Sequence, residues 1–169
     1  MPSETSEDNL TNHRDVVLAV NDRLLTELAD LFSDATISVR GDPLPPANMR
    51  HQIFMTICPG ESQFPDDVQT GGGAATVEEL AIILITLYNA GTVDQVGRMP
   101  DAVYNIENGL LEIKRRVLKA LVGNYLETDL HPLLSDCIKI RRSTTPMCDE
   151  KGLYSMQLEF GTPFFWDLT

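Results

Sequence analysis

The sequence has few of the residues that build metal and catalytic centres. Only three histidines are present, and they fall in three different segments: His13, His51 and His131. Neither a His-x-x-x-His nor a Cys-x-x-Cys spacing occurs, so the sequence predicts no structural metal and no cofactor. His51 and Cys58 are seven residues apart on one expected strand. An odd spacing directs their side chains to opposite faces, which disfavours a Cys–His nucleophile.

Cysteines and long apolar runs are also scarce. The three cysteines have no short spacing, and an odd number gives no disulfide framework. We expect Cys58, Cys137 and Cys148 to be buried thiols in a reducing compartment. The longest apolar run, residues 80–88, is far shorter than the roughly 20 residues that span a bilayer. The acidic, polar start is unlike a signal peptide, so we expect a cytoplasmic product without a membrane segment.

Basic residues are few. The chain has 13 Lys and Arg against 25 Asp and Glu, a net charge of −12. A negative surface of this size repels nucleic acid phosphate and argues against tight DNA binding, although not against DNA passing nearby.

Seven of the 13 basic residues fall in two neighbouring segments. They are Lys114, Arg115, Arg116, Lys119, Lys139, Arg141 and Arg142. Three interpretations remain open for this basic patch. It can be a solvated face with ordinary ion pairs such as Glu112 with Arg116. It can meet an acidic arm from a second copy in a head-to-tail contact that closes into a ring. It can also bind DNA directly.

No motif of a common enzyme class is complete. The glycines at 71–73 lack the Lys-Ser or Lys-Thr that a phosphate-binding P-loop requires, and the segment 60–64 lacks the last glycine of a nucleophile elbow. Adjacent carboxylates such as Asp66 and Asp67 are typical of solvated surface. We therefore expect a protein that is not an enzyme. A small hydrolase-type enzyme, whose histidine and carboxylates converge only in the fold, is the alternative from a different class.

The most informative stretch runs from residue 51 to residue 88. Two apolar, β-branched segments, 51–58 and 80–88, are separated by a long loop rich in proline, glycine and acidic residues. This pattern predicts the central antiparallel pair of a sheet, with an extended hairpin arm at one end. One small domain cannot bury such an arm, so we expect a second subunit to complete it. The candidate interface residues on the arm are Gly71, Gly72, Gly73, Glu78 and Glu79.

The second of these segments also fits a helix. Residues 76–79 have the form of a capping box, and apolar residues follow at helical spacing. A strand is favoured, because residues 82–85 would be apolar all round a helix and three of them are β-branched. The choice between strand and helix for residues 77–90 stays open on the sequence alone.

The remaining pattern predicts one α+β domain over residues 12–169, after a flexible acidic tail at 1–11. Apolar residues at helical spacing predict an amphipathic helix from a cap at Asn12 to about Phe32, and a second helix that begins near Asn105 or Asn108 and ends at Gly123 or Asn124. Strands are expected at 35–40, 136–142 and 153–160, and residues 162–168 continue the last strand or pin it to the helices. We expect a mostly antiparallel sheet of about five strands with two helices on one face.

Several of these segments carry a resemblance to a known family. They are Gly109-Leu-Leu, Val117-Leu-Lys-Ala-Leu121, Met156-Gln-Leu-Glu-Phe160, Phe165-Trp-Asp-Leu168 and the glycine-rich link between the second and third strands. From about Asn12 onward, their layout and hydrophobic pattern resemble the tail terminator, or tail completion, proteins of long-tailed bacteriophages. The family has no catalytic residues to carry over.

The resemblance implies a structural virion protein. Family members form a homohexameric ring on the tail tube, which fixes tail length and joins the tube to head-completion or neck proteins at the head–tail junction. DNA would pass through an acidic lumen without specific binding. Another ring component of the neck or tail tube is the alternative within this class, and an acidic DNA-mimic inhibitor is a third possibility.

Overall fold

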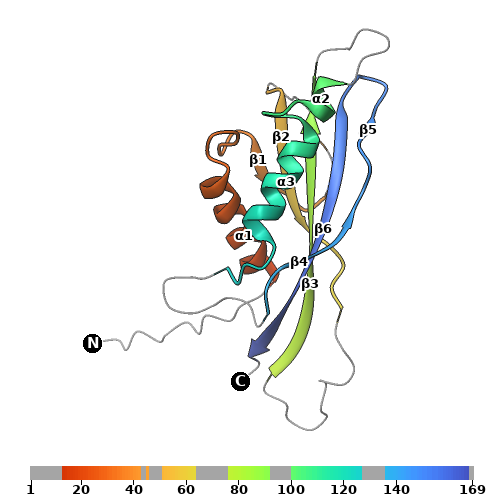
Figure 1. The fold of residues 1–169 in the computed structure, drawn as a ribbon. Coiled ribbons are helices and arrows are strands. Elements are labelled where there is room, and N and C mark those ends of the chain that lie inside the picture. Colours follow the sequence, from red (N-terminus) through yellow and green to blue (C-terminus); the bar gives the residue numbers. More distant parts are fainter. Residues whose placement is uncertain are drawn as a thin grey trace, which may run out of the picture.

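One mixed sheet with helices on one face makes up the described part of the chain (Figure 1). The computed structural model describes residues 13–42, 45, 51–63, 76–91, 100–126 and 136–167, apart from the side chains of 76–78 and 164–167. The elements are α1 (His13–Glu27), β1 (Ile37–Val39), β2 (Ile53–Pro59), β3 (Thr76–Asn89), α2 (Asp101–Tyr104), α3 (Leu110–Leu121), β4 (Lys139–Ser143), β5 (Met147–Cys148) and β6 (Tyr154–Asp167). The predicted α+β fold is confirmed. The short α2 and β5 were not predicted, because elements of four and two residues carry no usable periodicity.

The sheet has the strand order β1-β2-β3-β6-β4, and β5 pairs with the outer side of β6. All pairings are antiparallel except that of β1 with β2, which is parallel. The predicted central pair is confirmed, since β2 and β3 run antiparallel with Ile53 opposite Asn89. Residues 76–89 are a strand and not the helix that the capping-box pattern allowed. Because β3 pairs with strands on both sides, its β-branched residues fill the middle of a sheet.

One face of the sheet forms the core with α1 and α3. Alternate residues of β3 and β6 point to this face, which is the period of two that a half-buried strand requires. They include Ala81, Ile83, Ile85 and Leu87 on β3 and Met156, Leu158 and Phe160 on β6, all of them buried. From the helices, Val16, Val20, Leu24, Leu110, Ile113, Val117 and Leu121 pack against them. Apolar and polar residues alternate over 153–160 in the sequence, which predicts a half-buried strand; this prediction is confirmed, and the strand continues to Asp167.

The second helix buries a narrower stripe than its sequence predicts. Ile106 lies in the turn before α3 begins and is 87% exposed, while Leu111 and Val122 are 39% and 45% exposed. Their helical spacing in the sequence predicts all three on the apolar stripe of this helix. The assignment is wrong because α3 contacts the sheet and α1 through one side only, and Ile106 precedes the helix.

The region of β4 also buries fewer apolar side chains than its sequence predicts. Ile138 is fully buried, since its backbone bonds to Gly123 and Asn124 place it under the end of α3. The alternation of residues 136–142 in the sequence predicts that Ile140 also points inward, but it is 39% exposed. The pairing of β4 with β6 shifts register between Ile140 and Arg142, and β4 is the last strand on its side of the sheet. Ile140 therefore lies on an uncovered edge.

Candidate subunit interface

The two longest strands continue together beyond the rest of the sheet. β3 and β6 pair along their whole length, from Thr76 opposite Asp167 to Asn89 opposite Tyr154. By contrast, β2 pairs with β3 only from Ile83 onward, apart from a single bridge at Leu80, and β4 pairs with β6 only as far as Gly161. Among the described residues, the far end is thus a two-stranded segment, residues 76–80 with 163–167, in which Leu80 also bridges to Gln63; we call this segment the distal ribbon. It runs past α1 and the shorter strands (Figure 1).

A ribbon of this kind needs further contacts. Five residues at about 3.3 Å each give a length of roughly 17 Å. Two strands alone are marginally stable in water, and strand edges without a neighbouring strand tend to pair with another chain. The sequence of the ribbon includes Val77, Phe164, Phe165 and Trp166, which makes it rich in large apolar residues. The ribbon is therefore the strongest candidate for a contact with another subunit.

The ribbon is not the predicted arm in every respect. The arm was predicted from the loop between β2 and β3, whereas the described extension is made by β3 and β6. Gly71, Gly72 and Gly73 lie outside the described residues. Glu78 belongs to the ribbon as a backbone position of β3. Glu79 is a predicted interface residue of the arm, and its side chain lies on the core side of the sheet and is only 4% exposed.

Glu79 is instead part of a polar cluster under the start of α1. The Ser62 hydroxyl lies between the Glu79 carboxylate and the His13 ring, with its Oγ 3.1 Å from His13 Nδ1 and hydrogen-bonded to Glu79 Oε1. The other ring nitrogen, Nε2, is 2.8 Å from the carbonyl oxygen of Ile82. Neither His13 nor Ser62 was a predicted site residue. Their separation of 49 positions gives no local signal that a sequence pattern could reveal.

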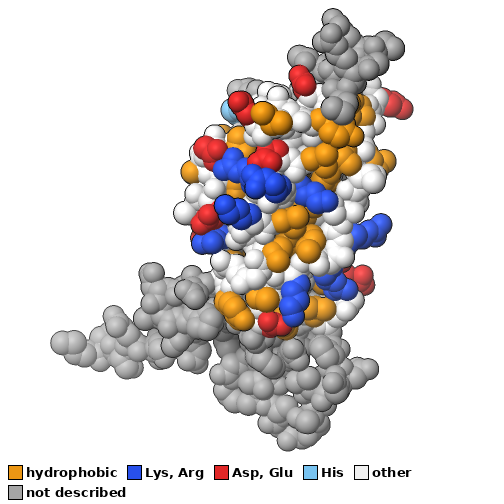
Figure 2. Space-filling view, viewed as in Figure 1, with side chains coloured by type: hydrophobic (Ala, Val, Ile, Leu, Met, Phe, Trp, Pro, Cys, Tyr) orange, Lys and Arg blue, Asp and Glu red, His pale blue; other side chains and the backbone are white. Residues whose placement is uncertain are grey.

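The four basic residues on α3 are partly neutralised by the chain itself. Arg116 makes two hydrogen bonds to Asp30, of 2.8 and 2.5 Å, and Arg115 makes two to Glu112, of 2.8 and 2.6 Å. The expected pair of Glu112 with Arg116 is therefore replaced by Glu112 with Arg115. Hydrogen bonds from the guanidinium groups lower the pKa of Asp30 and that of Glu112. Lys and Arg side chains gather on this helical face among Asp and Glu (Figure 2).

Two of the basic residues on β4 are likewise paired with carboxylates of the same chain. Lys139 contacts Asp136 at 2.6 Å, and Arg141 lies 3.6 Å from Glu159. The hydrogen bond from Lys139 lowers the pKa of Asp136. Within the described part of the chain, the basic residues of the patch that form no ion pair are Lys114, Lys119 and Arg142. These three cations are the ones available to an acidic partner.

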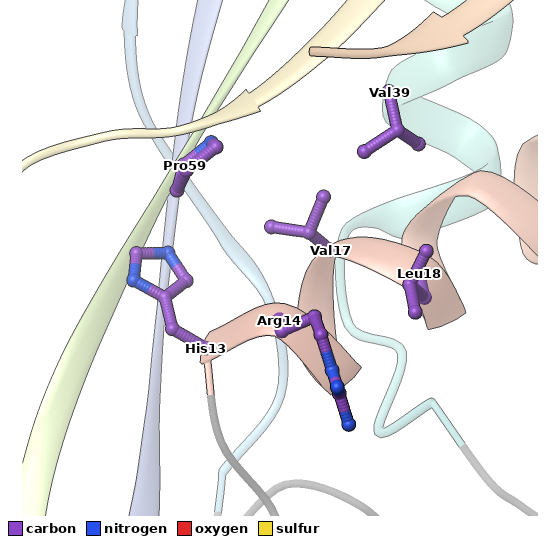
Figure 3. A pocket seen from close by; sticks show the side chains of 6 residues that line it. All are labelled: His13, Arg14, Val17, Leu18, Val39 and Pro59. Carbon is purple, nitrogen blue, oxygen red and sulfur yellow. The ribbon is translucent and has the colours of Figure 1, made fainter. Parts of the chain in front are cut away.

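A pocket of about 310 Å³ opens beside the start of α1 (Figure 3). It is lined by His13, Arg14, Val17, Leu18, Val39 and Pro59. Leu18 and Val39 are 45% and 41% exposed, so part of this apolar lining is open to water. Both ring nitrogens of His13 are engaged by Ser62 and Ile82. The pocket therefore suits an apolar side chain from a partner better than it suits a reaction that requires a free base.

The groups considered for chemistry do not converge in the described residues. Cys58 is 1% exposed, and burial raises the pKa of its thiol, which makes it a poor nucleophile. Cys137 is half-buried and Cys148 is exposed, so the prediction of buried cysteines holds for Cys58 alone. His131 lies outside the described part of the chain. Where the structure is described, no three His, Cys, Asp or Glu side chains form a group able to hold a metal ion.

None of the helices described here is long and apolar enough to cross a membrane. What these observations define is a two-layer α+β fold in which the β3–β6 strand pair extends beyond the other described strands. No protein-family model matches the chain, and no curated protein matches it in sequence. Among the solved structures that match is a chain of "Virion of native gene transfer agent (GTA) particle". The likeness has a TM-score of 0.50 and 14% identity, and it covers 88% of this chain and 92% of that chain. At this identity the likeness shows a shared fold.

Proposed function

We propose that this chain is a structural subunit of a phage-like particle and that it acts as a tail terminator. In this role it forms a homohexameric ring at the head–tail junction of the virion, on the end of the tail tube and against neck or head-completion proteins. The single observation that carries the proposal is the distal ribbon, which pairs as two strands within the described part of the sheet. A neighbouring subunit would supply the missing contacts.

Two further findings support this proposal. The fold is shared with a chain from a gene transfer agent virion over most of both chains. The net charge of −12 suits a ring through which DNA moves, because carboxylates facing the lumen repel phosphate and prevent sticking. The role is one of assembly and requires no catalytic residue.

The oligomeric state tests the proposal directly. The purified chain should have a mass in solution of six times 18.8 kDa and should appear in negative-stain electron micrographs as a sixfold ring with a central hole. Introducing V77P should abolish the ring and leave a folded monomer by circular dichroism, because proline removes a backbone donor from the ribbon. A wild-type chain that stays monomeric at tens of micromolar would contradict the proposal.

The position of the ring in the particle separates the two roles within this class. A terminator caps the tube end, so an antibody against the chain should label one site per particle at the head–tail junction. Labelling along the tube would favour a tail-tube component instead.

A further inference from the structure

An exposed isoleucine lies in the turn between α2 and α3. Ile106 is 87% exposed, the largest exposed fraction among the large apolar side chains of the described residues. Figure 1 shows α2 and the start of α3 at the end of the sheet opposite to the distal ribbon. Single apolar residues on a surface are common and need no explanation. What distinguishes Ile106 is the backbone that carries it.

The turn that carries this isoleucine is fixed by hydrogen bonds. Asn105 Oδ1 accepts from the backbone N–H of Glu107 at 2.8 Å and from that of Asn108 at 3.2 Å. Asn89 of β3, which is fully buried, donates from its Nδ2 to the Asn108 carbonyl at 3.0 Å. A Cβ on Gly109 would lie 2.6 Å from the backbone nitrogen of Asn105, so the turn closes this tightly only with glycine. The apolar side chain is therefore presented in a fixed position, and a partner that buries it pays little for ordering it.

An apolar pocket lies elsewhere on the surface. It is the pocket of about 310 Å³ beside the start of α1, and its lining includes Val17, Leu18, Val39 and Pro59. In Figure 3, Val17 of α1 and Val39 of β1 point toward each other across this space. Its volume has room for one branched aliphatic side chain and part of the turn that carries it. The pocket therefore matches the chemistry and the shape of the exposed isoleucine.

The turn does not reach the pocket of its own chain. Asn108 is bonded to Asn89 at one end of the β2–β3 pair, whereas Pro59, in the pocket lining, lies opposite Ile83 at the other end. From position 83 to position 89 is six strand residues, or roughly 20 Å. If Ile106 enters a pocket of this kind, the pocket must belong to another copy of the chain.

The charges beside the two surfaces are complementary. Glu107, next to Ile106, is exposed and forms no ion pair among the described residues. Arg14 lines the pocket, and its side chain is 76% exposed. Within the chain it contacts Asp15 at 3.2 Å, and an exposed pair of this kind contributes little and can be exchanged. A carboxylate that arrives with the isoleucine would therefore meet a cation at the pocket, and such complementarity fixes the orientation of a contact.

We propose that Ile106 of one copy occupies the α1 pocket of a second copy, with Glu107 beside Arg14. The two surfaces are different patches of the same chain, so the contact is head-to-tail, and contacts of this type either close into a ring or extend into an open chain. The inference rests on the proposed function for its partner, a second copy, and it adds a contact at the end of the sheet opposite to the distal ribbon.

The I106D variant tests the apolar half of this contact. A charged side chain is not accommodated in an apolar pocket, so the dissociation constant measured by sedimentation should rise by at least about tenfold. M147D, at an apolar residue of β5 that is 66% exposed, is the matched control and should keep the wild-type constant. Both positions are exposed, so both variants should keep the wild-type circular dichroism. An I106D chain that assembles as the wild type does would overturn the inference and leave the proposed ring standing.

Charge exchange tests the polar half. E107R and R14E each bring like charges together at the contact and should raise the dissociation constant by roughly threefold or more. The combined E107R/R14E variant restores an opposite pair and should assemble more tightly than either single variant. A combined variant that is no tighter than the weaker single variant would overturn the contact of Glu107 with Arg14.

The state of the wild-type chain separates this inference from the proposed ring. Open chains or dimers that I106D dissociates would contradict the sixfold ring and support the contact. A wild-type chain that is monomeric at tens of micromolar would overturn both.

Discussion

At the scale of single residues, the clearest ion pair joins two helical segments that are distant in the sequence. Arg116 of α3 makes its two hydrogen bonds to Asp30, in the turn that follows α1. A planar guanidinium that binds a carboxylate through two parallel bonds is the strongest geometry for such a pair. The pair explains why the pKa of Asp30 is lowered, and it ties the two helices together at their solvent side.

The D30N variant should therefore change the response to acid. A carboxyl group whose pKa is lowered on folding stabilises the fold above its unfolded value of about 3.9 and loses that contribution as the pH falls through its folded value. We expect D30N to be less stable than the wild type at pH 6 and to lose less stability between pH 5 and pH 2.5. Thermal unfolding across this range is the measurement. D34N, at an exposed carboxylate nearby that forms no ion pair in the described residues, is the control and should follow the wild-type curve.

At the scale of elements, β3 organises the domain. It pairs with β2 on one side and β6 on the other, and its core-facing residues meet α1 and α3. Ile85 is fully buried at the centre of this arrangement, between Ile57 and Leu158 on the neighbouring strands. The next residue, Leu84, points to the opposite face and is half-buried. The two positions differ in face and burial but not in secondary structure.

Alanine substitutions at these two positions should separate the faces. I85A creates a cavity in the core and should lower the free energy of unfolding by about 2–5 kcal/mol. L84A should cost clearly less, because its side chain lies outside the core cluster. Chemical denaturation of both variants measures the difference. Equal losses would contradict the assignment of the core to the helical face.

At the scale of the whole molecule, charge is distributed unevenly, and this distribution affects how copies of the chain would associate. The chain is acidic overall, yet Lys114 and Lys119 on α3 form no ion pair among the described residues. Arg115 and Arg116 between them are already neutralised by Glu112 and Asp30. In a head-to-tail ring, the two free lysines are the groups that would meet an acidic surface of the next copy.

Charge reversal at both lysines should weaken the assembly. We expect the K114E/K119E double variant to raise the dissociation constant of the ring by at least about tenfold at 0.1 M salt, and by less at 1 M salt, where charges are screened. Sedimentation at both salt concentrations measures this effect. K151E, at an exposed lysine in the turn before β6, is the matched control and should leave the assembly unchanged. An unaltered ring in K114E/K119E would remove the basic patch from the interface.

The elements themselves could largely be predicted from local patterns. The β-branched run on β3 favoured a strand without excluding a helix, the alternation on β6 predicted a strand, and helical spacing predicted α1 and α3. Prediction failed where a residue matched the apolar pattern of an element but lay at its margin, as Ile106 before α3 and Ile140 on the edge strand do. Burial at such a margin depends on what lies opposite, and no local pattern contains that information.

The sequence by itself determined the α+β fold class and the net negative charge, and it favoured strands over residues 80–88 and 153–160, because composition and periodicity depend on neighbours in the chain. Only the tertiary structure decided that β6 lies beside β3 along all of its length, so that the extension is a β3–β6 ribbon. It also decided that Glu79 is buried with Ser62 and His13. The physical reason is that strand partners and polar clusters depend on packing between segments far apart in the chain. The periodicity of one segment contains no information about which other segment packs against it.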